Sequence, residues 1–228
     1  MRIFLSALTD NFSTGIMKRI YCISGLGADE RVFQRLSIAN ATLIPIKWPA
    51  INWDDSMRSY AKKIAEQIQG EQPILLGLSL GGMLATEIGK LIITEKVFLI
   101  SSAKTRKELG YNFPLWKFAV NKHLVAFGLF KSLAPLSRYR LDLKTPEERI
   151  LIADMIKKTS LDFMKCAIHM IINWDNTIVN NDIIHIHGTK DKIITPKNIK
   201  ATHWIEGGGH FMIYNKAEII SKLVSQHL

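Results

Sequence analysis

One serine in this chain stands between two glycines in a pattern typical of catalytic nucleophiles. The motif G-L-S-L-G covers residues 77–81 and is centred on Ser79; the apolar run 73–76 precedes it and the run 82–89 follows it. This order predicts a strand, a tight turn and a helix, because glycine leaves room where a Cβ would clash. Such a turn exposes the hydroxyl at the end of a sheet, near the unpaired amides that begin the helix. The alternative is a structural turn with an inert serine.

A serine hydroxyl is a weak nucleophile, so Ser79 requires a base and an acid that orients the base. Among seven histidines, His210 differs because it follows three glycines directly after the last predicted strand. The other histidines fall in predicted strands, in central helices or in the tail. Asp191 lies in the turn after the preceding predicted strand. We therefore expect His210 as the base and Asp191 as the acid; an unimportant loop histidine and an ordinary turn aspartate are the alternatives.

A negatively charged oxygen develops when a serine attacks a carbonyl group, and it requires preorganised hydrogen-bond donors. We expect one donor to be the amide of Leu80, which follows Ser79. The other is the amide of Leu26, which lies between two glycines in the loop after the first predicted strand. The same loop resembles a phosphate-binding loop, but it lacks the third glycine of G-x-G-x-x-G and continues into two acidic residues. We therefore expect no dinucleotide there.

Two further histidines, His185 and His187, are two positions apart and so share one face of a predicted strand. Paired imidazoles are common metal ligands, but no H-E-x-x-H helix motif accompanies this pair. We therefore expect neither a metal ion nor a cofactor.

The elements that position these residues alternate between short apolar runs and helical runs, which is typical of β-α-β units and a parallel sheet. The strands are apolar throughout, as in a sheet that carries helices on both faces. The expected strands cover residues 19–24, 42–47, 73–78, 96–101, 182–187 and 201–205. The expected helices cover residues 30–36, 56–69, 81–93 and 216–227.

This alternation fails between residues 104 and 181, where three helical patterns stand in place of one crossover helix. They cover residues 115–133, 146–158 and 160–174 and are rich in aromatic residues and methionine. An insertion at the functional edge of a parallel sheet usually covers a site, so we expect a lid. The plainer alternative is that these side chains only pack onto the body of the protein. We expect residues 1–17 to form a disordered extension and residues 18–228 to form one domain.

The bulk composition excludes several classes of protein. The 228 residues are 47% hydrophobic and 22% charged, which fits a single globular domain. The net charge is +10, but the lysines are spread along the chain without interleaved aromatic residues, so we expect no nucleic-acid partner. No apolar run reaches the roughly 18–20 residues that cross a bilayer, so we expect no stable membrane insertion. Two cysteines fit the reduced thiols of a cytoplasmic protein.

Taken together, the sequence from residue 19 to the C-terminus resembles the α/β-hydrolase superfamily. The matching motifs are the loop 24–28, the elbow around Ser79, H-G-x-x-D ending at Asp191, and G-G-G-H ending at His210. The resemblance implies a mostly parallel sheet of about six strands, flanked by helices and carrying a helical lid. It also implies Ser79 as nucleophile, Asp191 as acid and His210 as base. Many relatives have His-Gly where this chain has Ser24 and a glycine, so a contact behind that loop is expected to differ.

The implied reaction is acyl transfer. We expect hydrolysis of a carboxylic ester or thioester, a small molecule with an apolar acyl group, through an acyl-enzyme intermediate. Two alternatives remain open. One is a lyase or C–C bond hydrolase of the same fold, in which His210 moves a proton and Ser79 is never acylated. The other is a non-enzymatic receptor that binds a small ligand beneath the lid.

Overall fold

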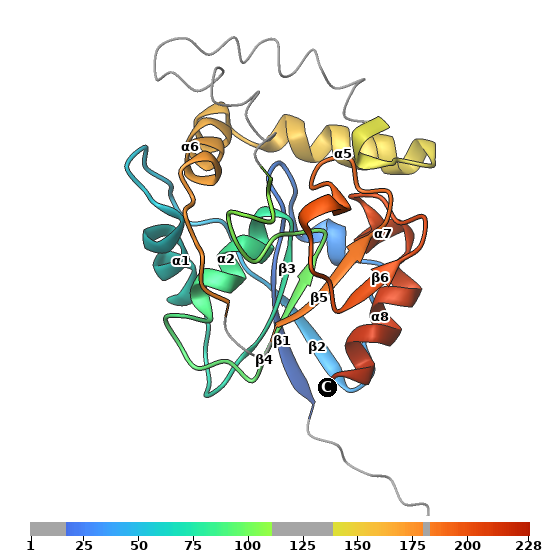
Figure 1. Cartoon of the computed structure of the whole chain (residues 1–228), viewed down its shortest axis with the longest axis horizontal. Helices are drawn as coiled ribbons and strands as arrows, with labels where there is room; N and C mark the ends of the chain where they lie inside the picture. Colours follow the sequence, from blue (N-terminus) through green and yellow to red (C-terminus); the bar gives the residue numbers. More distant parts are fainter. Residues whose placement is uncertain (1–16, 111–138, 180–182) are drawn as a thin grey trace, which may run out of the picture.

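The computed structural model describes residues 17–110, 139–179 and 183–228. Within them one sheet of six parallel strands forms the centre (Figure 1). The strands are β1 (Lys18–Ile23), β2 (Ala41–Pro45), β3 (Ile74–Leu78), β4 (Lys96–Ile100), β5 (Ile183–Gly188) and β6 (His203–Ile205). All six predicted strands are confirmed, each to within two residues at either end.

The strand order is β2-β1-β3-β4-β5-β6, and β1 pairs in parallel with both β2 and β3. After β1 the chain moves outward to β2 and then crosses to β3 on the other side. The loops that follow β1 and β3 therefore start from adjacent strands and diverge. In open α/β sheets a ligand usually binds where the strand order reverses in this way.

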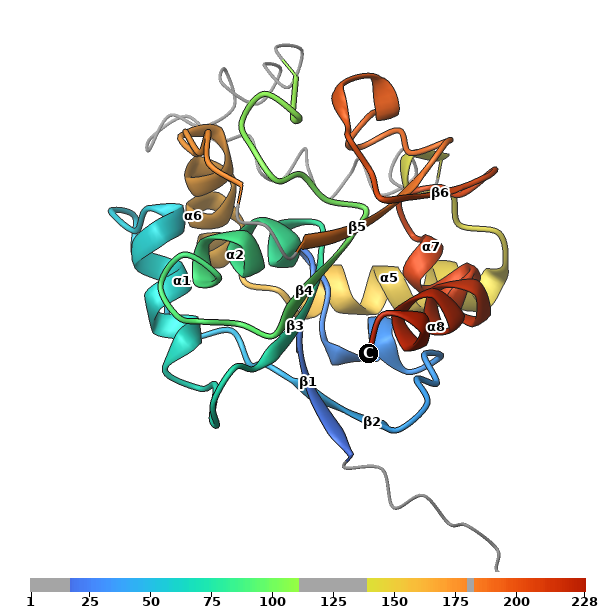
Figure 2. The same cartoon turned by 60° about the horizontal axis from the view of Figure 1, so that its bottom comes forward.

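Helices cover both faces of the sheet. Figure 2 shows α1 and α2 on one side, with α7 and α8 on the other. The helical elements are η1 (Glu30–Phe33), α1 (Met57–Ala65), α2 (Leu80–Ile88), α5 (Pro146–Lys158), α6 (Leu161–Ile172), η3 (Pro196–Asn198), α7 (Met212–Asn215) and α8 (Ala217–Gln226). The predicted helix 30–36 is wrong in type and length: it is one turn of 3-10 helix, capped by the Asp29 carboxylate.

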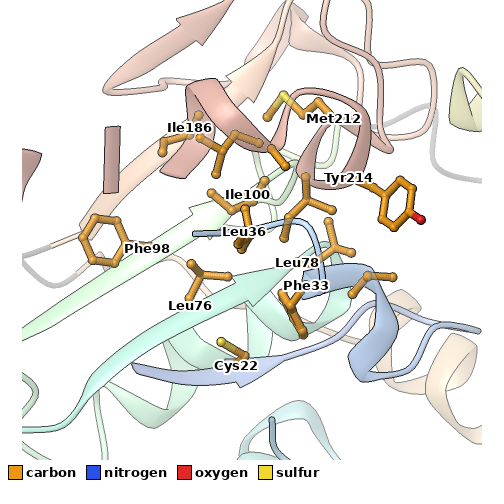
Figure 3. Packing of buried hydrophobic residues seen from close by; sticks show 14 of the residues in the cluster. Cys22, Phe33, Leu36, Leu76, Leu78, Phe98, Ile100, Ile186, Met212 and Tyr214 are labelled. Atoms are coloured by element: carbon orange, nitrogen blue, oxygen red, sulfur yellow. The ribbon is translucent and has the colours of Figure 1, made fainter. Parts of the chain in front are cut away.

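The two faces bury separate hydrophobic clusters, because successive strand residues point to opposite sides. In β1, Ile20 and Cys22 pack with α7 and α8, whereas Tyr21 and Ile23 pack with α1 and α2. Figure 3 shows the first cluster, in which strand residues meet Met212 and the side chains around it. Burial on both faces accounts for strands that are apolar throughout, as the sequence predicts.

Helices α5 and α6 lie across the edge of the sheet at which the strands end (Figure 1). The Thr145 side chain caps α5 by accepting from the Glu148 amide, and a proline begins the first turn. The predicted helix 146–158 is therefore confirmed, and 160–174 is confirmed with a shorter end. The predicted helix 115–133 and the predicted extension lie outside the described residues, except for Met17. No described helix is long and apolar enough to span a membrane.

Candidate active site

Ser79 occupies the sharp turn between β3 and α2. Its φ of 52° and ψ of −116° lie in a region that non-glycine residues rarely adopt, at a cost on the order of 1–3 kcal/mol. Two hydrogen bonds hold this backbone in place. The Ser79 amide donates to the Ile100 carbonyl at 3.0 Å, and the Ser102 hydroxyl donates to the Ser79 carbonyl at 2.6 Å. The end of β4 and the residues just after it therefore support the turn.

The two glycines of the motif are required by close backbone approach. A Cβ at residue 77 would overlap the backbone of Gly81, where α2 begins. A Cβ at Gly81 would overlap the carbonyl groups of Ile23 and Ser24 at the end of β1. The turn between β3 and α2 thus packs directly against the first strand. We call residues 77–81 the elbow.

The His210 imidazole lies between the hydroxyl of Ser79 and the carboxylate of Asp191. Its Nε2 is 3.0 Å from Ser79 Oγ, and its Nδ1 is 2.8 Å from Asp191 Oδ2. A carboxylate only accepts, so Nδ1 carries the proton and donates it. In the neutral ring, Nε2 then accepts from the serine hydroxyl. The structure thus brings together three side chains that the sequence singles out, over separations of 131 and 19 residues.

Asp191 is 2% exposed and its carboxylate is fully hydrogen-bonded. Oδ1 accepts from the amides of Ile193 and Ile194 at 2.8 and 2.9 Å, while Oδ2 accepts from His210. A buried charge is tolerated when it is satisfied in this way. The two amides also fix the direction of Oδ2. We call residues 189–194 the acid loop.

The acid loop and the segment 206–210, which we call the base loop, are joined through their backbones. The Lys190 amide donates to the Gly208 carbonyl at 2.8 Å, and the Thr189 side chain accepts from the Gly207 amide at 2.9 Å. The backbones approach so closely that a Cβ at Gly188 would overlap Gly208. The glycines before His210 therefore permit packing between two loops, and the base loop is held rather than free.

The loop after β1 lies against the elbow, as the sequence predicts. A Cβ at Gly25 would lie 3.4 Å from Ser79 Cβ. Ser24 closes this loop by donating to the Ala28 carbonyl at 3.0 Å. Within the described residues, the amides of Leu26 and Leu80 donate to no protein acceptor.

The apolar surroundings of the site come from α6 and α5. A Cβ at Gly27 would lie 3.5 Å from Ile156 of α5 and 3.8 Å from Met164 Sδ of α6. The ring centroid of Phe163 is 5.2 Å from that of Trp48, whose Nε1 donates to the Ala28 carbonyl. Both helices thus contact the loop after β1 with apolar side chains.

The described residues contain no group of three or more metal-ligating side chains. The side chains of His185 and His187 on β5 are both buried, and burial lowers the pKa of each imidazole. The thiols of Cys22 and Cys166 are buried as well, and burial raises the pKa of each. Neither cysteine has the character of a reactive nucleophile.

No family model and no curated protein matches this sequence significantly. Solved structures match it well. An enol-lactonase from Burkholderia xenovorans LB400 superposes with a TM-score of 0.71 at 16% identity, covering 93% of this chain and 92% of that one. An esterase from Exiguobacterium antarcticum gives 0.68 at 16% identity, with coverages of 92% and 91%. A Bacillus megaterium epoxide hydrolase gives 0.67 at 10% identity, with coverages of 92% and 93%.

The chain has the α/β-hydrolase fold. The predicted fold class is thereby confirmed. Structures of this fold include proteins named for different reactions, so the fold does not by itself select the chemistry. In this α/β-hydrolase fold, Ser79 stands at the end of β3 and the other two residues follow β5 and β6.

Sequence reasoning did not identify Ser102, which holds the Ser79 carbonyl. A signal was present, because Ser102 follows the end of the predicted strand 96–101 beside the elbow. It also assigned no role to His185 and His187, which lie behind the acid loop. Their hydrogen bonds depend on how the chain turns after β5 and on which ring nitrogen carries the proton, and no sequence motif shows either.

Proposed function

We propose that this protein is a serine hydrolase that cleaves a carboxylic ester or thioester through an acyl-enzyme intermediate. Ser79 is the nucleophile, His210 the general base and Asp191 the acid that orients it. The observation that carries this proposal is the continuous hydrogen-bonded line from Ser79 Oγ through both nitrogens of His210 to Asp191, at 3.0 and 2.8 Å. This geometry matches what nucleophilic catalysis by serine requires.

The reaction begins when Ser79 Oγ attacks the carbonyl carbon of the substrate and His210 Nε2 takes the hydroxyl proton. His210 then gives that proton to the leaving alcohol or thiol, which departs as the carbonyl re-forms. Water enters, His210 removes its proton, and the hydroxide attacks the acyl-enzyme. The ester of Ser79 breaks, the acid is released and the serine regains its proton. Asp191 stays ionised and stabilises the imidazolium at each stage.

The amides of Leu26 and Leu80 bind the negatively charged oxygen in both tetrahedral intermediates. Their free N–H groups and the contact between Gly25 and Ser79 support this assignment. The donors are fixed by backbone, so they need no reorganisation when charge develops. A donor of this kind contributes about 100–1000-fold in rate. These steps require neither a metal ion nor a cofactor.

The substrate is a small molecule with an apolar acyl group. Apolar side chains from α5 and α6, among them Ile156 and Met164, face the loop after β1. The contact between Ser79 Oγ and His210 Nε2 at 3.0 Å provides the proton acceptor that acyl transfer requires, and an acyl adduct on Ser79 would distinguish this reaction from a lyase reaction that leaves the serine unmodified. The strained backbone at Ser79 favours an enzyme over a receptor, because a receptor gains nothing from a serine held in such a turn.

The test is turnover of a panel of p-nitrophenyl esters and acyl thioesters of increasing chain length. The wild-type protein is expected to hydrolyse members of the panel, and Ser79→Ala to lose about 10⁶-fold in kcat. Ser225→Ala on α8 serves as the matched control, because that hydroxyl only accepts from the Ala39 amide at an exposed position. Wild-type protein inactive on the whole panel, or equal turnover by Ser79→Ala, would contradict the proposal.

A further inference from the structure

Two buried histidines on β5 take no part in the reaction described above. His185 and His187 lie on the same face of the strand, and neither side chain is exposed. Their rings meet edge to face with centroids 5.2 Å apart. Burial lowers the pKa of both, that of His185 well below its usual value. Both rings are therefore neutral near neutral pH, and their hydrogen bonds depend on which nitrogen carries the proton.

The contacts of His187 identify its protonated nitrogen. Nε2 lies 2.9 Å from the carbonyl oxygen of Ile194, and because a carbonyl only accepts, Nε2–H donates. In the neutral ring, Nδ1 then accepts. The atom that faces it is Nε2 of His185, 3.3 Å away, which therefore donates. Hydrogen bonds thus run in one direction, from His185 to His187 to Ile194.

Ile194 connects this chain of hydrogen bonds to Asp191. Its carbonyl accepts from His187, while its amide donates to Oδ1 of Asp191 at 2.9 Å. The end of the acid loop is thereby tied back to β5. Nε2 of His187 also lies 3.6 Å from Oδ2 of Asp191, the oxygen that accepts from His210. The N–H dipole of His187 is therefore beside the negative charge of the carboxylate.

Among the residues that the structure describes, only His187 donates to the Ile194 carbonyl. Ile194 is 2% exposed, so water does not replace a lost partner at its carbonyl. The Trp204 ring of β6 packs against His187 edge to face, at 5.8 Å between centroids. Within the described part of the chain, the charged and titratable groups that act on the pair are Asp191 of the acid loop, His210 of the base loop, and Lys104 and Glu108 of the segment after β4.

We propose that His187, with its tautomer set by His185, is a positioning residue for the catalytic acid. By holding the Ile194 carbonyl it fixes the Ile194 amide, and so the direction in which Asp191 presents Oδ2 to His210. The inference rests on the proposed function of the triad and adds residues that touch neither substrate nor reacting atoms. A displacement of about 1 Å in a catalytic group costs up to roughly 100-fold in rate.

Two substitutions at residue 187 separate the donor from the bulk of the ring. His187→Gln keeps an N–H that reaches toward the Ile194 carbonyl and an oxygen that accepts from His185, whereas His187→Leu keeps only volume. His187→Leu is expected to lower kcat by about 10–100-fold with KM unchanged, because substrate binding does not involve the acid. His187→Gln is expected to restore most of kcat.

A second readout does not depend on turnover. The proton of His210 Nδ1 that is shared with Asp191 gives a downfield proton resonance, because it lies in a short hydrogen bond to a carboxylate. This resonance is expected to move upfield or disappear in His187→Leu and to persist in His187→Gln. Circular dichroism confirms that each variant is folded. If His187→Leu does not fold, His185→Leu is measured instead, with a smaller loss of roughly tenfold in kcat.

The results separate this inference from the proposed function. Wild-type protein that hydrolyses no ester or thioester contradicts the function, whereas the resonance still reports on positioning. If folded His187→Leu matches the wild type in kcat and in the resonance, the positioning role is wrong. It is also wrong if Leu and Gln at residue 187 reduce kcat equally, or if His185→Leu, measured in place of an unfolded variant, behaves as the wild type does.

Discussion

The elbow and the acid loop hold two members of the proposed triad by different combinations of steric packing and hydrogen bonding. The elbow is packed backbone against backbone, since no Cβ fits at Gly77 or Gly81, and two hydrogen bonds to the Ser79 amide and carbonyl add to this packing. The acid loop is fixed by hydrogen bonds, from two amides to Asp191 and from His187 to the Ile194 carbonyl. Steric packing does not change with pH, whereas hydrogen bonds from buried histidines do. The two regions should therefore fail under different perturbations.

The largest effect is expected at the elbow. Gly77→Ala places a Cβ against backbone that cannot rotate away, so we expect a loss of at least about 3 kcal/mol in the free energy of unfolding, or no folded protein. Gly89→Ala is the control: its φ is −61° and the nearest atoms lie at 3.5 Å or more, so stability should change by less than about 1 kcal/mol. Urea unfolding followed by circular dichroism measures both. If Gly77→Ala were as stable as the wild-type protein, the claim that steric packing fixes the elbow would be wrong.

Asp191→Asn tests the role of hydrogen bonding in the acid loop. The amide oxygen can still accept from the loop amides, but the NH₂ group then faces His210 Nδ1, which must give up its proton and so adopt the wrong tautomer. We expect kcat to fall about 10⁴-fold with the fold retained. Steady-state kinetics on the best ester of the panel measure the loss, with exposed Asp54→Asn as control. A decrease of less than about tenfold would show that orientation by Asp191 matters little.

The free energy of unfolding should depend on pH through His185 and His187, the two buried histidines of β5 behind the acid loop. Burial lowers the pKa of His185 and His187 below the usual value of 6.5, so the unfolded chain binds protons below about pH 6.5 that the folded protein excludes. The free energy of unfolding should therefore fall as the pH drops, by at most about 1.4 kcal/mol per pH unit for each histidine. Urea unfolding at about pH 7.5 and about pH 5 measures this decrease, which should be smaller in His185→Leu. An equal decrease in that variant would contradict the assignment.

The smallest effect is expected in the loop after β1, which combines both kinds of support. Ser24→Ala removes the hydroxyl that donates to the Ala28 carbonyl, but Trp48 Nε1 still donates to the same oxygen at 3.3 Å. We expect a loss of about 1 kcal/mol in the free energy of unfolding. Ser24→Ala combined with Trp48→Phe leaves that carbonyl without either donor and should cost more than the two single changes together. Strict additivity would show that the two donors act independently.

Features that depend on steric packing could be predicted from the sequence. Steric requirements are visible as residue types, so the glycines around Ser79 and before His210 locate the elbow and the base loop. Strands buried on both faces give continuous apolar runs, so their positions follow closely. Helix ends are less certain: Ile68 continues the apolar pattern of α1, but the helix ends at Ala65 and the backbone continues in three-residue turns.

Hydrogen bonds between distant segments have no such signature. The contact from Ser102 to the Ser79 carbonyl requires β4 to lie beside β3 in a particular register. The contact from His187 to Ile194 requires a specific tautomer within a closed turn. These hydrogen bonds depend on the folded backbone, and the same residue types elsewhere in the chain would not form them.

The most direct measurement is the site and rate of reaction with a fluorophosphonate, mapped by mass spectrometry of proteolytic peptides. The wild-type protein should carry one adduct, on Ser79. In His210→Ala the rate of labelling should fall by about 10²–10⁴-fold, because the serine proton no longer has an acceptor. An adduct at another residue, or an unchanged rate in His210→Ala, would contradict the proposal that Ser79 is activated by His210.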